Sequence, residues 1–200
     1  MKERIKKYWE TKSIFSKASD IFFIIFVIAM LFPQGRLAIG GVINRVKALI
    51  VQPGINENGK LVPENDFNWN LQGISGSETN LSKSKSKVIF INLWATWCPP
   101  CVGEMPEIQK LYEHFKDNEN IDFYLITNDK LSKIKSFVEK RAYTFPVYHS
   151  LSDTPVSFRT RSIPTTFVIS KSGRIVIQKT GAANWGGDKM INIVEDLIKK

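Results

Sequence analysis

The only two cysteines of this 200-residue chain stand three positions apart. Cys98 and Cys101 enclose Pro99 and Pro100, and Trp97 precedes the group. A structural disulfide usually joins distant parts of a chain and gains stability from the loop that it closes. A pair this close closes almost no loop, so its spacing favours reversible thiol–disulfide exchange.

A helix that begins at this pair would change the reactivity of its thiols. Proline is well tolerated at the first helical positions, because the amides there have no partner within the helix. The positive end of the helix favours the thiolate, which is the attacking species. We therefore predict that Cys98 is the exposed nucleophile and that Cys101 is the shielded thiol that resolves the mixed disulfide. Pro99 and Pro100 would shape the active-site turn, and Trp97 would form an apolar shoulder beside the sulfur.

The hydrophobic pattern supplies the elements that position the pair. Buried or paired strands are predicted over residues 88–94, 121–127, 165–170 and 174–180. Amphipathic helices are predicted by the apolar positions of residues 105–115, 131–138 and 190–198. An extra hairpin is expected at residues 67–81. This order of elements predicts an α/β fold, with a central mixed sheet flanked by helices and preceded by the hairpin.

Residues 66–200 resemble the TlpA/ResA-like branch of the thioredoxin superfamily. The resemblance rests on three segments, NLWATWCPPC at residues 92–101, EMP at 104–106 and SIPTTFVI at 162–169, together with Gly173. It implies a thioredoxin-like fold and a thiol–disulfide oxidoreductase that works through the Cys98–Cys101 dithiol. No other cofactor and no metal is expected.

The resemblance also implies roles for further residues. The Ile163–Pro164 bond would be cis and would lie against the cysteines, with the backbone of Ile163 free to pair with an extended substrate segment. Trp97, Ile163 and Pro164 would then bind the substrate, and Ala95 would complete an apolar rim. Family members of the cytochrome-maturation type carry a functional glutamate at the position of Glu104. We expect Glu104 to help move the proton of the resolving thiol, and a solvated helix carboxylate is the alternative.

Asn92 departs from thioredoxin, which carries a buried aspartate at the matching strand position. An asparagine side chain cannot accept and return a proton, so that base role does not transfer to Asn92. The departure leaves Glu104 as the nearest candidate for a titrating partner of the cysteines.

The N-terminal part of the chain has a different character. Residues 1–51 hold nine Lys or Arg and three Asp or Glu, which accounts for +6 of the formal charge of +9. Twelve unbroken apolar residues follow the basic start, at residues 21–32. Twelve helical residues rise about 18 Å, against a hydrocarbon core of about 30 Å, whereas a helix from Ile14 would have about nineteen residues. We predict a basic leader and a transmembrane or signal-anchor helix over residues 1–33.

The flanks of this segment set the expected topology. No Ala-x-Ala cleavage site follows the apolar run, so an uncleaved signal anchor is preferred over a cleaved signal peptide. The basic start keeps the N-terminus in the cytoplasm, which places the rest of a single-pass protein in the periplasm or outside the cytoplasmic (inner) membrane. Residues 34–65 would form an amphipathic segment and a linker, and residues 66–200 the catalytic domain. The rest of the chain lacks a basic stripe interleaved with aromatic residues, which argues against nucleic-acid binding.

Other roles of the cysteine pair stay open. With His114 the pair imitates the start of a zinc finger, but thirty-four residues separate His114 from His149, where three to five are usual. Two thiolates can hold a soft metal, so a copper chaperone is an alternative. A tethered peptide-binding module is another, and it would still work after Cys98→Ser. A peroxidase with a single reactive cysteine fits the tight pair poorly.

The sequence therefore predicts a membrane-anchored, extracytoplasmic thiol–disulfide oxidoreductase that reduces disulfides in exported proteins, as in cytochrome c maturation. Disulfides persist in an oxidising compartment, so a reductase there needs a supply of electrons. The resemblance suggests a membrane electron carrier of the DsbD/CcdA type as donor, and apocytochromes c or copper-site proteins as clients. The direction of transfer depends on the reduction potential of the pair.

Overall fold

The computed structural model describes residues 13–31 and 51–200, and the chain divides into two compact units, residues 1–40 and 41–200. The first basic residues of the predicted leader, 1–12, lie outside the described residues. So does the predicted amphipathic segment up to residue 50.

The N-terminal unit contains helix α2 (Ile14–Leu31), which has 18 residues and rises about 27 Å. Its described large apolar side chains are exposed. Within residues 13–31 and 51–200, no helix is both long enough and apolar enough to cross a membrane. The membrane-spanning helix that the sequence predicted is therefore not found among the described residues.

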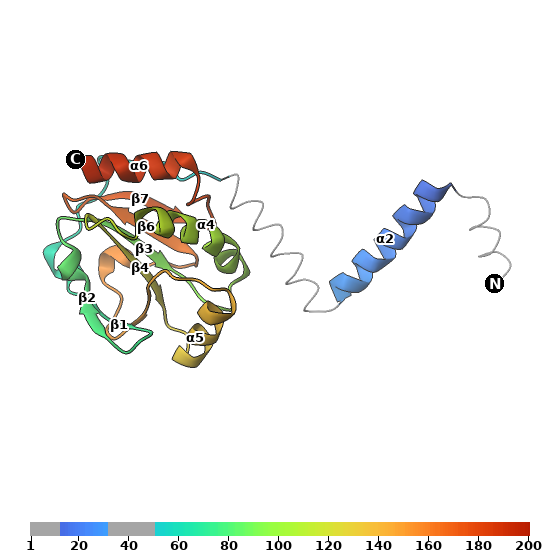
Figure 1. The fold of residues 1–200 in the computed structure, drawn as a ribbon, viewed down its shortest axis with the longest axis horizontal. Helices are drawn as coiled ribbons and strands as arrows, with labels where there is room; N and C mark the ends of the chain where they lie inside the picture. Colours follow the sequence, from blue (N-terminus) through green and yellow to red (C-terminus); the bar gives the residue numbers. More distant parts are fainter. Residues whose placement is uncertain (1–12, 32–50) are drawn as a thin grey trace. The chain divides into compact units, whose positions relative to one another are not determined.

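The second unit is built on a seven-stranded sheet in the order β2-β1-β5-β4-β3-β6-β7 (Figure 1). Its strands are β1 (Asn70–Gly73), β2 (Glu78–Asn80), β3 (Val88–Leu93), β4 (Ile121–Thr127), β5 (Val147–Ser150), β6 (Thr165–Ile169) and β7 (Ile175–Thr180). Strands β3, β4 and β5 are parallel, and the other pairs are antiparallel. The predicted mixed sheet and N-terminal hairpin are thus confirmed. Strand β5 was not predicted, because only its first residue is fully buried.

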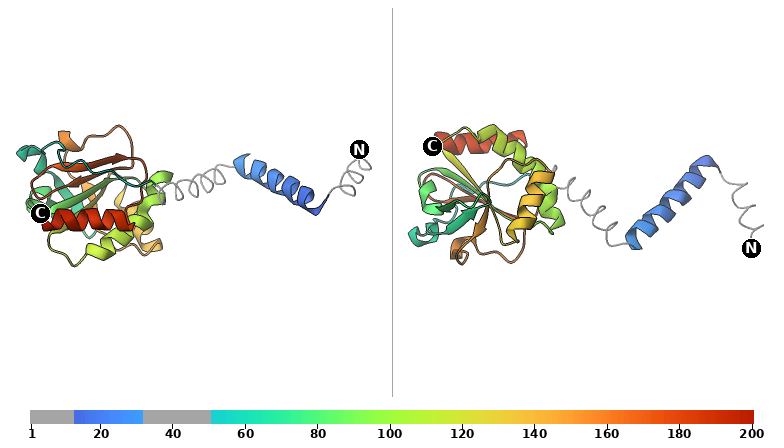
Figure 2. Two further views of the ribbon diagram at one scale, coloured as in Figure 1. Left: turned by 90° about the horizontal axis from the view of Figure 1, so that it is seen from above. Right: turned by 60° about the horizontal axis from the view of Figure 1, so that its bottom comes forward.

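Three helices cover one face of this sheet, α4 (Pro99–Phe115), α5 (Leu131–Lys140) and α6 (Asp188–Lys199). Their buried side chains form one core cluster with Val88 and Phe90 of β3. Figure 2 shows α4 and α6 on the same side of the sheet. Because side chains alternate along a strand, Ile89 and Ile91 face the second core cluster. Three short 3₁₀ helices contribute to that second cluster, η1 (Glu64–Phe67), η2 (Leu81–Ser84) and η3 (Val156–Phe158).

The packed chain begins earlier than the boundary predicted at residue 66. The Ile175 amide donates to the carbonyl of Lys60 at 2.9 Å, and the Val62 amide donates to the carbonyl of Gly173 at 2.9 Å. A Cβ at Gly59 would lie only 1.7 Å from the carbonyl oxygen of Ile175, so glycine permits this close approach. Residues 56–62 of the predicted linker therefore pair with β7 and the turn before it. Their polar composition gave little sign of this, because backbone groups make most of these contacts.

Candidate active site

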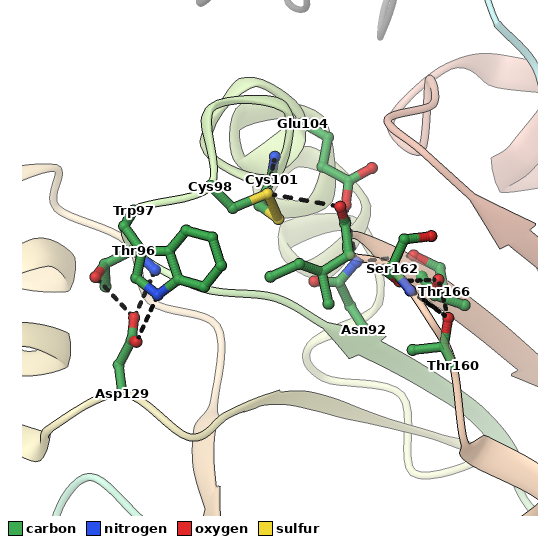
Figure 3. The surroundings of a disulfide bond; sticks show 12 residues. Asn92, Thr96, Trp97, Cys98, Cys101, Glu104, Asp129, Thr160, Ser162 and Thr166 are labelled. Carbon is green, nitrogen blue, oxygen red and sulfur yellow. Dashed lines mark hydrogen bonds between the residues drawn. A yellow bond between two sulfur atoms is a disulfide. The ribbon is translucent and has the colours of Figure 1, made fainter. Parts of the chain in front are cut away.

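The cysteine pair lies at the N-terminus of α4, where Cys98 and Cys101 form a disulfide with their Cα atoms 5.3 Å apart (Figure 3). Cys98 is the N-cap residue, and its Sγ accepts a hydrogen bond from the Cys101 amide at 3.3 Å. Pro99 and Pro100 occupy the first two helical positions. The predicted helix start is confirmed, and with it the placement of a sulfur over the positive helix end.

The exposure of the nucleophile differs from the prediction. Cys98 is only 4% exposed and Cys101 is fully buried in this disulfide form. The carbonyl oxygen of Ile163 lies 3.7 Å from the Cys98 Sγ and covers it. The Ile163–Pro164 bond is cis, as predicted. Both cysteines are buried in this disulfide form, so the open access predicted for Cys98 is wrong here, and the backbone before β6 lies against its sulfur.

Glu104 lies one helical turn beyond Cys101 and is fully buried. Its Oε1 accepts a hydrogen bond from Asn92 Nδ2 at 2.9 Å, and its Oε2 accepts from Trp185 Nε1 at 2.8 Å and from the Ala183 amide at 3.2 Å. Burial raises the pKa of Glu104 to about 7, although these three hydrogen bonds oppose the rise. The alternative of a solvated helix carboxylate is therefore wrong, and a group that can exchange protons near neutral pH lies in the helix that carries the cysteines.

Two neighbouring strands position the side-chain amide of Asn92, which contacts the Glu104 carboxylate. Asn92 of β3 is the register partner of Thr166 of β6. Its Nδ2 donates both to Glu104 Oε1 and to Thr166 Oγ1, the latter at 2.8 Å. Sequence reasoning missed Ala183 and Trp185, because they follow β7 in a segment with no chemical motif and reach the site only through the fold.

A second carboxylate supports the exposed side of the site. Asp129 accepts hydrogen bonds from the Thr96 amide at 2.6 Å, the Thr96 Oγ1 at 2.7 Å and the Trp97 Nε1 at 3.1 Å (Figure 3). The sequence analysis did not single out Asp129. A signal was available, because β3 and β4 are adjacent parallel strands and the residues that follow them meet at one edge of the sheet.

A hollow of about 600 Å³ opens against the residues that precede Cys98 in the chain. It is lined by three residues of the predicted rim, Ala95, Trp97 and Ile163, and by the polar side chains of Asp129 and Arg159 among others. Trp97 is 69% exposed there. Pro164, the fourth residue of the predicted rim, is buried and does not line the hollow.

The two histidines of the zinc alternative lie on different elements. His114 ends α4, with its Nε2 3.5 Å from Glu195 Oε1 of α6, and His149 belongs to β5. Within the described part of the chain, no three His, Cys, Asp or Glu residues gather into a group that could hold a metal ion.

Residues 57–198 match the family model described as Redoxin. The chain belongs to the Redoxin family. It is 30% identical over 135 residues to the thiol-disulfide oxidoreductase ResA of Bacillus subtilis, covering 66% of this chain and 73% of that protein. It is 29% identical over 137 residues to ResA of Halalkalibacterium halodurans, covering 68% and 76%. The thioredoxin-like protein YneN of Bacillus subtilis is 30% identical over 124 residues, covering 61% and 70%.

Solved structures show the same fold. The thioredoxin domain of a thiol-disulfide oxidoreductase from Bacteroides vulgatus superposes with a TM-score of 0.56 at 22% identity, covering 70% of this chain and 96% of that domain. With its relatives and its Cys98–Cys101 pair, the chain is a TlpA/ResA-like thiol–disulfide oxidoreductase of the thioredoxin superfamily.

Proposed function

We propose that this oxidoreductase reduces disulfides of exported proteins while its N-terminal segment holds it at the outer face of the cytoplasmic membrane. The observation that carries the proposal is a cysteine pair at the N-terminus of α4 with the buried Glu104 one turn further along the same helix. This arrangement supplies both a stabilised thiolate and a proton acceptor for the second thiol.

The reaction proceeds by two exchanges. The Cys98 thiolate attacks one sulfur of the client disulfide, forms a mixed disulfide and releases the client's other sulfur as a thiolate. The Cys101 thiol then gives its proton to the Glu104 carboxylate, and the resulting thiolate attacks the Cys98 Sγ. That step releases the second client sulfur, which leaves the client as a dithiol and the enzyme as the disulfide of this structure. Two electrons pass from enzyme to client in each cycle.

The pKa of Glu104 supports this residue as the proton acceptor. A free cysteine has a pKa of about 8.5, and a base works well when its own pKa lies near the operating pH. With a pKa of about 7, Glu104 is present in both protonation states near neutral pH. It can therefore take a proton from a thiol and return it in the next cycle.

Sequence features of the N-terminal unit support the proposed location. Basic residues precede an apolar segment, and the described large apolar side chains of α2 are exposed. A signal anchor would direct the catalytic unit outward. The enzyme disulfide would then be reduced by a membrane dithiol carrier of the DsbD/CcdA type, and the clients would be apocytochromes c or copper-site proteins.

The reduction potential of the full chain tests the direction of transfer. We expect a single two-electron transition below about −230 mV in a dithiothreitol titration, as for a reductant. A potential near about −120 mV would instead identify an oxidant that introduces disulfides. In intact cells we expect a membrane-impermeant maleimide to label the reduced cysteines, and protection from the reagent would overturn the proposed location.

A further inference from the structure

The two oxygens of the Glu104 carboxylate have different neighbours. Oε2 faces two donors from the loop after β7, the Ala183 amide and the Trp185 indole. Oε1 faces a single donor, Nδ2 of Asn92. A backbone N–H and an indole N–H can only donate, whereas a side-chain amide offers a donor on one side and an acceptor on the other.

This difference determines which oxygen of the Glu104 carboxyl can carry a proton. A proton on Oε2 would point toward two N–H groups, neither of which accepts a hydrogen bond, so the buried O–H would lack a partner. A proton on Oε1 meets the amide of Asn92, whose Oδ1 is buried with no hydrogen-bond partner among the described residues. If that amide turns over, Oδ1 accepts from the Glu104 O–H and from the hydroxyl of Thr166, which now lies 2.8 Å from Nδ2, and Nδ2 takes the place where Oδ1 has no partner among the described residues. Only Oε1 therefore has a neighbour that can become a hydrogen-bond acceptor.

Packing holds the two donors of the loop after β7 in place. The Trp185 side chain is fully buried, and its ring meets Phe90 edge-on with 5.3 Å between centroids. The backbone at Gly186 lies so close to α4 that a Cβ there would be 2.7 Å from the carbonyl oxygen of Glu107. One carboxylate oxygen therefore faces two fixed donors, and the other faces an amide that can turn over. The two oxygens differ in their ability to carry a proton.

We propose that Trp185 and the Ala183 amide are positioning groups that keep Glu104 Oε2 as a hydrogen-bond acceptor and direct its exchangeable proton to Oε1, against Asn92. The inference rests on the proposed role of Glu104 in thiol–disulfide exchange. It assigns the control of that proton to a loop that lies outside the cysteine motif.

Other titratable or charged groups lie on the elements around Glu104, whereas Asn92 of β3 and Thr166 of β6 are neutral. Helix α4 also carries Cys98 at its N-cap, Cys101, Glu107 with its partner Lys110, Tyr112, Glu113 and His114. Strand β7 carries the half-buried Lys179, and α6 carries Asp188, Lys189, Glu195, Asp196 and Lys199. Removing the Trp185 donor changes none of these charges, so a shift in titration after that change reports the hydrogen bond.

The variant Trp185→Phe removes the indole N–H and keeps an aromatic ring against Phe90. We expect the Glu104 titration midpoint, followed by ¹³C NMR of glutamate carboxyls and assigned by comparison with Glu104→Gln, to rise by about one pH unit. The pH profile of thiol–disulfide exchange should move by the same amount in the full chain. In Trp185→Phe combined with Glu104→Gln, the shift of the pH profile should vanish.

Trp69→Phe is the matched control, because Trp69 is equally buried and its indole N–H donates to Ser150 Oγ at 2.7 Å, away from Glu104. Its Glu104 midpoint should stay unchanged. An unchanged midpoint in Trp185→Phe, or an equal shift in the control, would overturn the inference.

The unaltered chain gives a second measurement that does not depend on a variant folding. The Trp185 indole N–H signal in a ¹H–¹⁵N spectrum should titrate with the midpoint of the Glu104 carboxyl, and a signal that stays constant across that midpoint contradicts the inference. If the chain exchanged no disulfides while both NMR titrations agreed, the proposed function would fail and the hydrogen-bond assignment would stand.

Discussion

Two carboxylates flank the cysteine pair, and each accepts a hydrogen bond from a tryptophan indole. Glu104 accepts from Trp185 and is fully buried, whereas Asp129 accepts from the largely exposed Trp97 at the edge of a hollow. The two carboxylate–tryptophan pairs are chemically alike, and they differ in burial. Removing water disfavours a charge, so the buried carboxyl holds a proton near neutral pH.

The exposed pair has a different task. Asp129 collects two donors from Thr96 and one from Trp97, which ties the residues before Cys98 to the loop after β4. Such bonds fix the arrangement of the residues that they join. Under the proposed function, the buried side of the site would control proton transfer and the exposed side would order the surface that a client meets.

The largest effect is expected at the cysteines between these two sides. Cys98→Ser should abolish reduction of a disulfide-bonded peptide, because serine is not a nucleophile for sulfur in this exchange. Cys101→Ser should still attack and should accumulate a mixed disulfide, which mass spectrometry would detect. Activity retained in Cys98→Ser would favour the peptide-binding alternative.

The buried side is tested by Glu104→Gln, which keeps the size of the side chain and removes the proton acceptor. We expect the exchange rate at pH 8 to fall at least about 100-fold, as is typical for loss of a general base. The inflection near pH 7 should disappear from the pH profile. A parent-like profile measured by stopped-flow fluorescence would remove Glu104 from the mechanism.

The same carboxyl makes stability depend on pH. Glu104 keeps its proton up to about pH 7 in the folded state and to about 4.5 when unfolded, so the folded state binds more protons between these values. Stability from this group is therefore complete below about pH 4.5 and is lost as the pH rises through 7. The change amounts to about 3 kcal/mol. Urea unfolding at pH 4.5 and pH 8 should show it in the parent and not in Glu104→Gln.

The smallest effect is expected on the exposed side. Asp129→Ala frees Trp97, so the KM for a disulfide-bonded peptide should rise roughly three- to tenfold, the cost of about one hydrogen bond. The rate with a small disulfide such as oxidised dithiothreitol should change little. Asp117→Ala, at an exposed position just after α4, is the matched control. Equal losses for peptide and small disulfide would show that Asp129 acts on the cysteines and not on docking.

Local patterns predicted most elements of the catalytic unit. The apolar runs that became β3 and β4 and the periodic positions of α4 and α6 were visible because both faces of a central strand, or one face of a helix, must be buried. Strand β5 and the pairing of the residues before position 66 were not predicted. Their pairing depends on backbone contacts with β1, β4 and β7, which leave little trace in side-chain type.

The sequence by itself determined the reaction. A cysteine pair with prolines between them at a helix start, and the segment that ends in Pro164, can be read without coordinates because their chemistry depends on neighbours in the chain. Only the tertiary structure decided the surroundings of the two carboxylates near that pair. Trp185 lies 81 residues from Glu104, and Asp129 lies 32 residues from Trp97. Burial and hydrogen bonding arise when distant segments pack together, so the protonation behaviour of Glu104 and the placement of Trp97 depend on the fold.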